Sequence, residues 1–380
     1  MEKIKNISTI ILISAFLFGL SGICWFHDGA EYSVAERRYL KQFPEMEYET
    51  IMSGKFMSEF ETYVTDQFPA RDAFRGIKTA VALSVFAQKE NNGLYLADGY
   101  INKVEYPYHP DSITHAAKVL NGIYAKYLEG TACNVYYGII PDKGYFLSQA
   151  NGYPAMDYEQ LEADFTEAMS QVKISNSEDG TQLKDAMTYI NLFDVMQLDD
   201  FYKTDTHWRQ EEISDVAAVI AEAMGKELDA KYEICQLSNP FYGVYHGQLA
   251  LPKDGETLYY LTNDVLNECK VFDYANGKKI GIYNFQKAEG NDPYEMYLSG
   301  SLSLITIENP NSENEDELVI FRDSFGSSIA PLFVEEYRKI TLVDIRYIHS
   351  GFLGNYIKFD NQDVLFLYST MVLNNSETLK

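Results

Sequence analysis

Three polar residues that lie far apart in the chain have the types needed for nucleophilic chemistry. Asp205 and His207 are two positions apart in "YKTDTHWRQ", and Ser324 lies in "ELVIFRDSFGSS". A serine hydroxyl is a weak nucleophile at neutral pH and needs an imidazole to accept its proton. A carboxylate beside that imidazole fixes its tautomer and stabilises its charged form. The sequence therefore nominates Ser324 as nucleophile, His207 as general base and Asp205 as the group that orients His207.

Each of these residues also has a purely structural interpretation. Serine is a favoured helix N-cap, and Ser324 precedes an apparent helix in which Pro331 allows either a late start or a kink. Asp-x-His is common and by itself would mark only a capped helix start. Taken alone, Ser324 is better explained as a cap, although it follows a buried strand and α/β folds bind ligands at the carboxyl ends of their strands. The chemical interpretation is favoured because the two motifs together supply the hydroxyl, the imidazole and the carboxylate that the chemistry needs. The helix that follows would supply part of an oxyanion hole through its free N–H groups.

The elements that must position these residues alternate between helix and strand over residues 109–380. Helical spacing predicts helices over residues 110–128 and 158–173 and beyond His207, and strands are predicted at 133–141 and 187–195. Unbroken apolar strands are predicted at 317–321, 339–344 and 363–368. Such strands between helices indicate a mostly parallel sheet covered on both faces, an α/β fold. Residues 241–307, rich in tyrosine and glycine, are interpreted as an inserted or appended β-rich part.

The N-terminus carries a targeting signal. Lys3 and Lys5 precede an uncharged run from Ile7 to Phe26, which His27, Asp28 and Glu31 follow. A helix of that length spans about 30 Å, the thickness of the hydrocarbon layer of a bilayer. This predicts a signal anchor over residues 1–30 and a single-pass protein of the cell membrane with an extracytoplasmic domain. Cleavage as a signal peptide is the alternative, and the protein would then be secreted.

Residues 31–108 are predicted to form a juxtamembrane region of helices and a hairpin. An amphipathic helix is expected from about Gly54 to Ala87, with an interruption at Pro69. Asp98-Gly99 in "NNGLYLADGYIN" is the turn signal of a β-hairpin.

Charge and cysteine spacing limit the partners. The chain has 31 basic and 56 acidic residues, a net charge of −25, which would repel the phosphates of nucleic acid. We therefore expect no nucleic-acid partner. The four cysteines lack metal-site spacing, and His109 and His115 are six positions apart, so neither a metal nor another cofactor is expected. Buried thiols are the default for the cysteines, with a Cys235 to Cys269 bridge as the alternative.

The motifs together resemble a known family. "TDTHWR" and the distant "FRDSFGSS" are similar to the DHHW family and the related alginate O-acetyltransferases. "YSVAERRYLKQFP" resembles the family's S-x-x-E-x-R-x-L segment, and "DQFPARD" its Asp-x-Phe-Pro-x-Arg helix. "GIIPDK", "YEMYLSGS" and "VLFLY" also fit. Thr206 departs from a double histidine, and the glycine and asparagine oxyanion donors have no clear match, with Ser301 where relatives often carry asparagine.

The resemblance implies a fold and an activity. The fold would be SGNH hydrolase-like (flavodoxin-like), a three-layer α/β/α domain with the triad order permuted. The activity would be that of an extracytoplasmic polysaccharide O-acetyltransferase or acetylesterase in which Ser324 forms an acyl-enzyme. Polysaccharide would be the acceptor, and relatives often work with a membrane-bound O-acyltransferase partner. The alternative is a catalytically inactive, surface-anchored glycan-binding or scaffold protein of the same fold.

Three further polar or aromatic residues are candidates for binding the substrate. Lys143 follows the strand that ends at Pro141, Arg322 ends the strand before Ser324, and Trp208 adjoins His207. Lys143 could contact an anionic sugar, or could belong to an ordinary solvated turn. Arg322 could bind a glycan carboxylate, or could pair with a nearby acid.

Overall fold

The computed structural model describes residues 2–26, 29–175, 183–251 and 254–380. The chain divides into two compact units. The first contains Met1–Asn92 and His246–Asp254, and the second contains Gly93–Tyr245 and Gly255–Lys380. The hairpin predicted in the juxtamembrane region therefore groups with the second unit.

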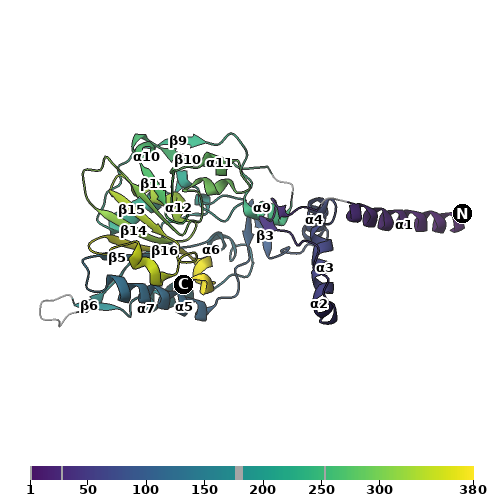
Figure 1. The fold of residues 1–380 in the computed structure, drawn as a ribbon, viewed down its shortest axis with the longest axis horizontal. Coiled ribbons are helices and arrows are strands. Elements are labelled where there is room, and N and C mark those ends of the chain that lie inside the picture. The colour runs from purple at the N-terminus through teal and green to yellow at the C-terminus, as the bar shows by residue number, and fades with distance from the viewer. Residues whose placement is uncertain (1, 27–28, 176–182, 252–253) are drawn as a thin grey trace. The chain divides into compact units, whose positions relative to one another are not determined.

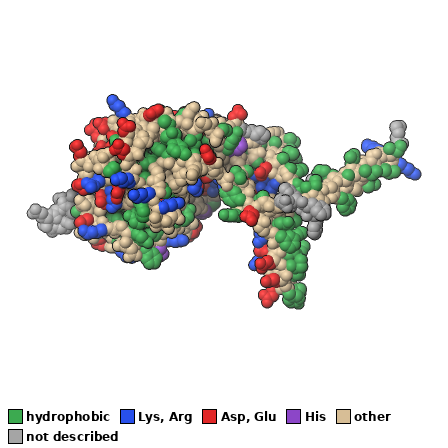
Figure 2. Space-filling view, turned by 45° about the horizontal axis from the view of Figure 1, so that its top comes forward, with side chains coloured by type: hydrophobic (Ala, Val, Ile, Leu, Met, Phe, Trp, Pro, Cys, Tyr) green, Lys and Arg blue, Asp and Glu red, His purple; other side chains and the backbone are tan. Residues whose placement is uncertain are grey.

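The first unit is mainly helical. Its elements are α1 Glu2–Phe26, β1 Tyr32–Ser33, β2 Arg38–Tyr39, α2 Tyr48–Met52, α3 Lys55–Asp66, α4 Arg71–Ala80 and a π-helical turn, Val81–Val85. The predicted interruption at Pro69 is confirmed, because it lies between the end of α3 and the start of α4. Figure 2 shows apolar side chains gathered along one side of the segment formed by α2 and α3, and acidic side chains along another. This pattern is typical of an amphipathic helix.

The two family-like segments of this unit are joined by ion pairs. Arg38 donates to both carboxylate oxygens of Asp66, at 2.9 and 2.5 Å. Arg71 lies 2.5 Å from the carboxylate of Glu36. Pairing with the guanidinium of Arg38 lowers the pKa of Asp66 and outweighs the opposing effect of burial. The "ERR" and "DQFPAR" motifs are therefore two sides of one ionic cluster.

The predicted membrane span is not confirmed. α1 is a helix of 25 residues. Within the described residues, no helix has both the length and the apolar character needed to cross a membrane. His27 and Asp28, which border the predicted span, lie outside the described residues.

A central sheet of eight strands, in the order β12-β11-β13-β15-β14-β16-β5-β8, organises the second unit. Its strands are β5 Asn134–Ile140, β8 Thr188–Ile190, β11 Lys270–Asp273, β12 Lys278–Ile280, β13 Leu304–Glu308, β14 Glu317–Arg322, β15 Lys339–Val343 and β16 Asp363–Ser369. The strands from β15 through β14, β16 and β5 to β8 pair in parallel. The predicted mostly parallel sheet is thus confirmed for the part that carries the unbroken apolar strands.

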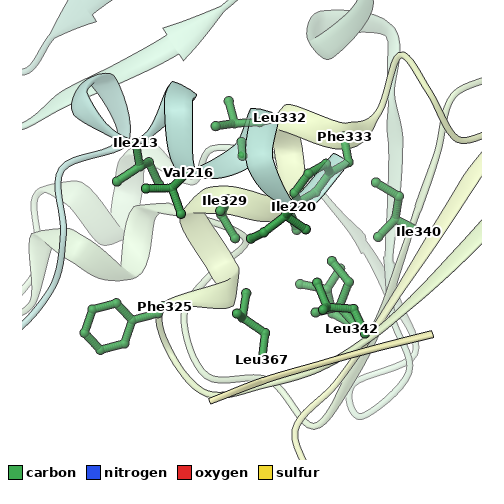
Figure 3. Packing of buried hydrophobic residues seen from close by; sticks show 14 of the residues in the cluster. Ile213, Val216, Ile220, Phe325, Ile329, Leu332, Phe333, Ile340, Leu342 and Leu367 are labelled. Atoms are coloured by element: carbon green, nitrogen blue, oxygen red, sulfur yellow. The ribbon is translucent and has the colours of Figure 1, made fainter. Parts of the chain in front are cut away.

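Helices cover both faces of this sheet. α5 (Pro110–Ile123) and α7 (Tyr158–Met169) lie on one side, and α12 (Gly326–Ile329) lies on the other (Figure 1). α8 (Ser214–Ala223) packs on the same side as α12, where Val216 and Ile220 meet Ile329 and Leu342 (Figure 3). Each face therefore has its own apolar core, as expected for an α/β fold of three layers.

The remaining elements of the second unit are short. They are β3 Leu94–Ala97, β4 Tyr100–Lys103, α6 Lys143–Leu147, β6 Lys173–Ser175, β7 Leu183–Asp185, β9 Glu233–Gln236, β10 Tyr259–Thr262, α10 Asp264–Glu268, α11 Phe285–Ala288 and α13 Thr370–Leu373, while α9, Val244–Leu249, runs from this unit into the first. β3 and β4 pair antiparallel around Asp98 and Gly99, which both have positive φ angles, so the predicted hairpin is confirmed.

The part at 241–307 that was interpreted as inserted or appended contributes strands to the central sheet. β11 and β13 pair antiparallel with each other, and β13 pairs antiparallel with β15. The helix predicted at 110–128 is α5 followed by a π-helical turn, Tyr124–Leu128, and its N-cap is His109, with Pro110 in the first turn. Cys235 and Cys269 carry free, partly buried thiols, so the alternative disulfide is not formed.

Candidate active site

Asp205, His207 and Ser324 form one hydrogen-bonded line in the second unit. Nδ1 of His207 lies 2.6 Å from Oδ1 of Asp205, and Nε2 lies 2.7 Å from Oγ of Ser324. Asp205 is fully buried, His207 is 8% exposed, and Ser324 is half-buried. The chain thus brings together residues 117 positions apart and leaves the hydroxyl at the accessible end of the line.

The carboxylate of Asp205 fixes the orientation of the imidazole. Its Oδ1 also accepts the backbone N–H of His207 at 3.1 Å, and its Oδ2 accepts the N–H of Val244 at 2.7 Å. An ionised carboxylate can only accept hydrogen bonds, so the proton of a neutral imidazole must be on Nδ1. Nε2 then presents its lone pair to the hydroxyl of Ser324, which is the arrangement a general base requires.

A tight loop carries Asp205 and His207. Phe201 and Trp208 form an isolated antiparallel bridge, and the N–H of Tyr202 donates to the carbonyl of His207 at 3.1 Å. Gly243 lies against this loop: a Cβ at that position would come within 2.3 Å of the backbone of Thr204. Only glycine leaves room for this approach, and the approach places the N–H of Val244 beside Asp205.

The imidazole of His207 is also packed between aromatic rings. The ring of Tyr294 stacks on it with centroids 3.9 Å apart and planes 7° apart, and the ring of Phe325 lies at 5.2 Å. The hydroxyls of Tyr294 and Ser328 are 2.7 Å apart, and Nε1 of Trp208 donates to the Ser328 hydroxyl, also at 2.7 Å. Burial raises the pKa of Tyr294, so its ring faces the imidazole as a neutral phenol.

The turn that presents Ser324 is held between two strands. Oδ1 of Asp323 accepts the N–H of Phe325 at 3.0 Å, and Oδ2 accepts the N–H of Ser369, at the end of β16, at 2.8 Å. The N-cap of α12 is Phe325, so Ser324 lies before the cap, and its hydroxyl meets His207. α12 has four residues and continues as a 3-10 turn, Ala330–Phe333, which contains Pro331. The helix whose N–H groups were expected to face Ser324 is therefore a single turn.

The three residues nominated for substrate binding lie inside the unit. Nζ of Lys143 donates to the carbonyls of Ile101 at 2.7 Å and Tyr202 at 3.0 Å, and the side chain is 1% exposed. Trp208 is fully buried. The alternative of a solvated turn at Lys143 is also wrong, because the ammonium group joins two segments of the interior.

Arg322 is also fully buried, and its partners are groups of the protein interior. Its guanidinium donates to the carbonyls of Gly300 and Leu302, each at 3.3 Å, and lies 3.7 Å from the carboxylate of Asp344. Burial lowers the pKa of Arg322, and the charge of Asp344 opposes that effect. Arg322 thus fixes the "LSGS" segment beneath the serine turn. We retain none of these three residues as a substrate contact.

Sequence reasoning missed two contributors to the site. Tyr294 is one of 30 tyrosines in the chain, and nothing in its local pattern distinguishes it from tyrosines that only fill half-buried positions. Val244 contributes through its backbone N–H, a group that every residue except proline carries. Within the described ranges, no three His, Cys, Asp or Glu side chains are grouped so that they could hold a metal ion.

Comparison with known proteins identifies the fold. Neither a protein-family model nor a curated protein matches the chain. A DHHW family protein from Eubacterium siraeum matches in structure with a TM-score of 0.59 and 19% identity, over 76% of this chain and 95% of that one. Bacillus cereus PatB1, solved with a sulfonyl adduct, matches with a TM-score of 0.57 and 18% identity, over 74% and 95%. The O-acetyltransferase domain of Pseudomonas putida AlgJ matches with a TM-score of 0.42 and 11% identity, over 74% and 92%.

The sheet topology defines the second unit as an α/β domain, and the two matches with TM-scores above 0.5 show that the chain shares its fold with these proteins. The resemblance to the DHHW family that the sequence motifs predicted is confirmed at the level of the fold.

Proposed function

We propose that the second unit is an O-acyltransferase or esterase that uses Ser324, His207 and Asp205 to form and resolve an acyl-enzyme. The observation that carries the proposal is the continuous line of two short hydrogen bonds, 2.6 and 2.7 Å, from a buried carboxylate to a half-buried hydroxyl. A serine that only capped a helix would have no reason to meet an imidazole held in this tautomer.

The reaction has two balanced halves. Oγ of Ser324 bonds to the carbonyl carbon of an acyl ester while its proton passes to Nε2 of His207. The tetrahedral intermediate collapses when the bond to the leaving alcohol breaks, and the imidazolium returns the proton to that oxygen. In the second half a sugar hydroxyl, or water, loses its proton to Nε2 and attacks the acyl carbon. The ester bond to Oγ of Ser324 then breaks, and the imidazolium returns the proton to Oγ. The two acceptors share every step before the second attack.

Polysaccharide is the acceptor that we propose, because the chain resembles the family whose members acylate such polymers. The sulfonyl adduct found on PatB1, a structure of the same fold, suggests a direct chemical probe. A sulfonyl fluoride reacts with a serine whose hydroxyl is activated by a base, and the product is a stable sulfonyl ester. Intact-mass spectrometry can therefore test the proposal before the acceptor is known.

The test compares three forms of the chain after exposure to phenylmethanesulfonyl fluoride and, separately, to p-nitrophenyl acetate. The wild type is expected to gain one adduct on Ser324 and to release p-nitrophenol. Ser324→Ala should gain none, and Ser238→Ala, which removes an exposed serine elsewhere in the unit, should behave like the wild type. Equal labelling of all three forms, or no reaction in the wild type, would leave the inactive scaffold of the same fold as the better description.

We also propose that this unit acts outside the cytoplasm, as the charged residues before the apolar run at 7–26 predict. A membrane-bound acyltransferase that delivers the acyl group would then be its partner. Cell fractionation combined with N-terminal sequencing of the mature chain tests the location. Recovery of the intact chain in the cytoplasmic fraction would contradict it.

A further inference from the structure

A pocket of about 400 Å³ lies on the central sheet, away from the serine turn. It opens on the sheet face that α5 and α7 cover elsewhere, over the first residues of β14 and β15. Glu317, which begins β14, lies in the pocket wall, whereas Ser324 follows the other end of the same strand. At about 3.3 Å per residue, the strand separates the pocket from Ser324 by roughly 15–20 Å.

Two buried threonine hydroxyls form the floor of the pocket. Thr306 of β13 and Thr341 of β15 are directly paired across the strands, and their exposed fractions are 5% and 4%. Neither hydroxyl is hydrogen-bonded to another residue in the described part of the chain. Neither hydroxyl is among the enclosed polar atoms that lack a partner, so both face the open space of the pocket, where a ligand can reach them. The neighbouring positions in this row, Phe272 and Val319, are apolar, so the two threonines are the polar positions of the row.

Aromatic and charged side chains form the rim. The rings of Tyr274 and Tyr356 meet edge to face with centroids 6.0 Å apart, and the side chains are 40% and 51% exposed. The carboxylate of Glu317 accepts from both Lys339 and Gln362, each at 3.4 Å. These long hydrogen bonds leave a carboxylate and an ammonium group available at the pocket wall. The amide of Gln362 is held by the backbone of Lys358 and Asp360, and Asn361 adds a second amide to the wall.

This combination of groups fits a hydroxylated, uncharged ligand. Hydroxyls of such a ligand can both donate to and accept from the threonine hydroxyls, and can pair with the carboxylate and amide groups of the wall. The tyrosine rings offer flat apolar faces to C–H groups. A purely apolar ligand would leave the floor hydroxyls without a partner. A phosphorylated ligand would meet three carboxylates, of Glu315, Glu317 and Asp360, against only two ammonium groups, of Lys339 and Lys358.

We propose that this pocket is a saccharide-binding subsite that holds a glycan segment at a distance from Ser324. Its volume lies within the range of about 300–1,000 Å³ typical of small-molecule sites, which suits a short saccharide. The inference does not depend on acyl transfer, because none of the groups that line the pocket takes part in the proposed reaction.

The test is a titration of the full chain with two defined probes, a β-1,4-linked glucose tetramer and a β-1,4-linked N-acetylglucosamine tetramer, followed by calorimetry. At least one probe is expected to bind. Tyr356→Ala should weaken that binding about ten-fold through the lost ring contact, and Thr341→Val, which keeps the shape and removes the hydroxyl, should weaken it as well. Tyr347→Ala removes a tyrosine that is 61% exposed and does not line the pocket, so it is the matched control.

The outcomes separate this inference from the proposed function. Ser324→Ala should bind the probe as the wild type does. Binding that is absent for both probes at millimolar concentration, or unaffected by Tyr356→Ala and Thr341→Val when both variants are folded, overturns the subsite. Probe binding without sulfonylation of Ser324 would overturn only the acyl-enzyme mechanism.

Discussion

Asp205→Asn isolates the contribution of the buried carboxylate to the proposed reaction. The side chains have nearly the same shape, so the substitution should leave the loop at 202–208 in place. The amide oxygen of asparagine can still accept the N–H of Val244, and its NH₂ group then faces Nδ1 of His207, with loss of the hydrogen bond from the backbone N–H of His207. Because NH₂ can only donate, Nδ1 must become the acceptor and Nε2 must carry the proton. The imidazole would then be unable to accept the proton of Ser324.

The size of the effect follows from the geometry. In the transition state the imidazole becomes cationic while its Nδ1 lies 2.6 Å from the carboxylate of Asp205. Two unit charges whose centres are about 4 Å apart attract one another by about 4 kcal/mol at an effective dielectric constant of about 20. Loss of that attraction slows the reaction about 10³-fold. The wrong tautomer adds to the loss, and the same change in a serine protease lowers kcat about 10⁴-fold. We therefore expect acylation of Asp205→Asn to be 10³- to 10⁴-fold slower than that of the wild type.

The measurement is the rate of sulfonylation and of p-nitrophenyl acetate cleavage, with circular dichroism as the check on folding. Asp273→Asn is the matched control, because Asp273 is also fully buried but lies at the end of β11 and accepts N–H groups of its own turn. It should retain nearly full activity. A folded Asp205→Asn protein whose rate stays within about ten-fold of the wild type would refute the reasoning.

Three further predictions follow from the surroundings of the site. Tyr294→Phe keeps the ring stacked on His207 and should lower the acylation rate only a few-fold, whereas Tyr294→Leu removes the stack and should lower it at least about ten-fold; similar rates for the two variants would contradict a positioning role. Gly243→Ala forces the backbone away from Thr204, so it should lower the free energy of unfolding by about 1–3 kcal/mol in urea titrations and reduce acylation; unchanged stability would show that the close approach is not required. Burial raises the pKa of Asp200 from 3.8 to about 6, so its contribution to stability is full below pH 4 and is lost as the pH rises through 6. Asp200→Asn should therefore be more stable than the wild type at pH 7, by at most about 3 kcal/mol, and should lose this advantage at pH 4; denaturation curves at the two pH values test this.

The sequence predicted the strands of the parallel sheet because their burial leaves a local signature. Both faces of β14, β15 and β16 pack against an apolar core. Their sequences are therefore unbroken runs of mostly apolar residues. The hairpin at Asp98-Gly99 was predictable for a similar reason, since its turn needs residues that tolerate positive φ angles. The pairing of β13 with β15 was not predictable, because it depends on contacts between segments that are distant in the chain and leaves no local pattern in the sequence.

The residue types of the candidate site could be nominated from the sequence, but their surroundings could not. Lys143 and Arg322 stand at strand ends, where polar side chains often face a ligand. Their burial depends on carbonyl groups and a carboxylate from distant segments, among them Ile101, Gly300 and Asp344. A charged side chain that finds such partners can be enclosed at moderate free-energy cost, and no local pattern records whether the partners exist.

The tyrosine-rich part at 241–307 contributes two groups that hold Asp205 and His207 in position. It supplies the N–H of Val244 to one carboxylate oxygen of Asp205 and the ring of Tyr294 to one face of His207. The parallel sheet alone would present Ser324 but would leave the imidazole free to turn about its side-chain bonds. The N–H of Val244 holds the carboxylate of Asp205, and the ring of Tyr294 stacks on the imidazole of His207. Nε2 of His207 therefore stays beside Oγ of Ser324 before any substrate binds. Changes at Tyr294, which lies outside the strands of the sheet, should therefore alter the rate of acylation more than they alter the stability of the sheet.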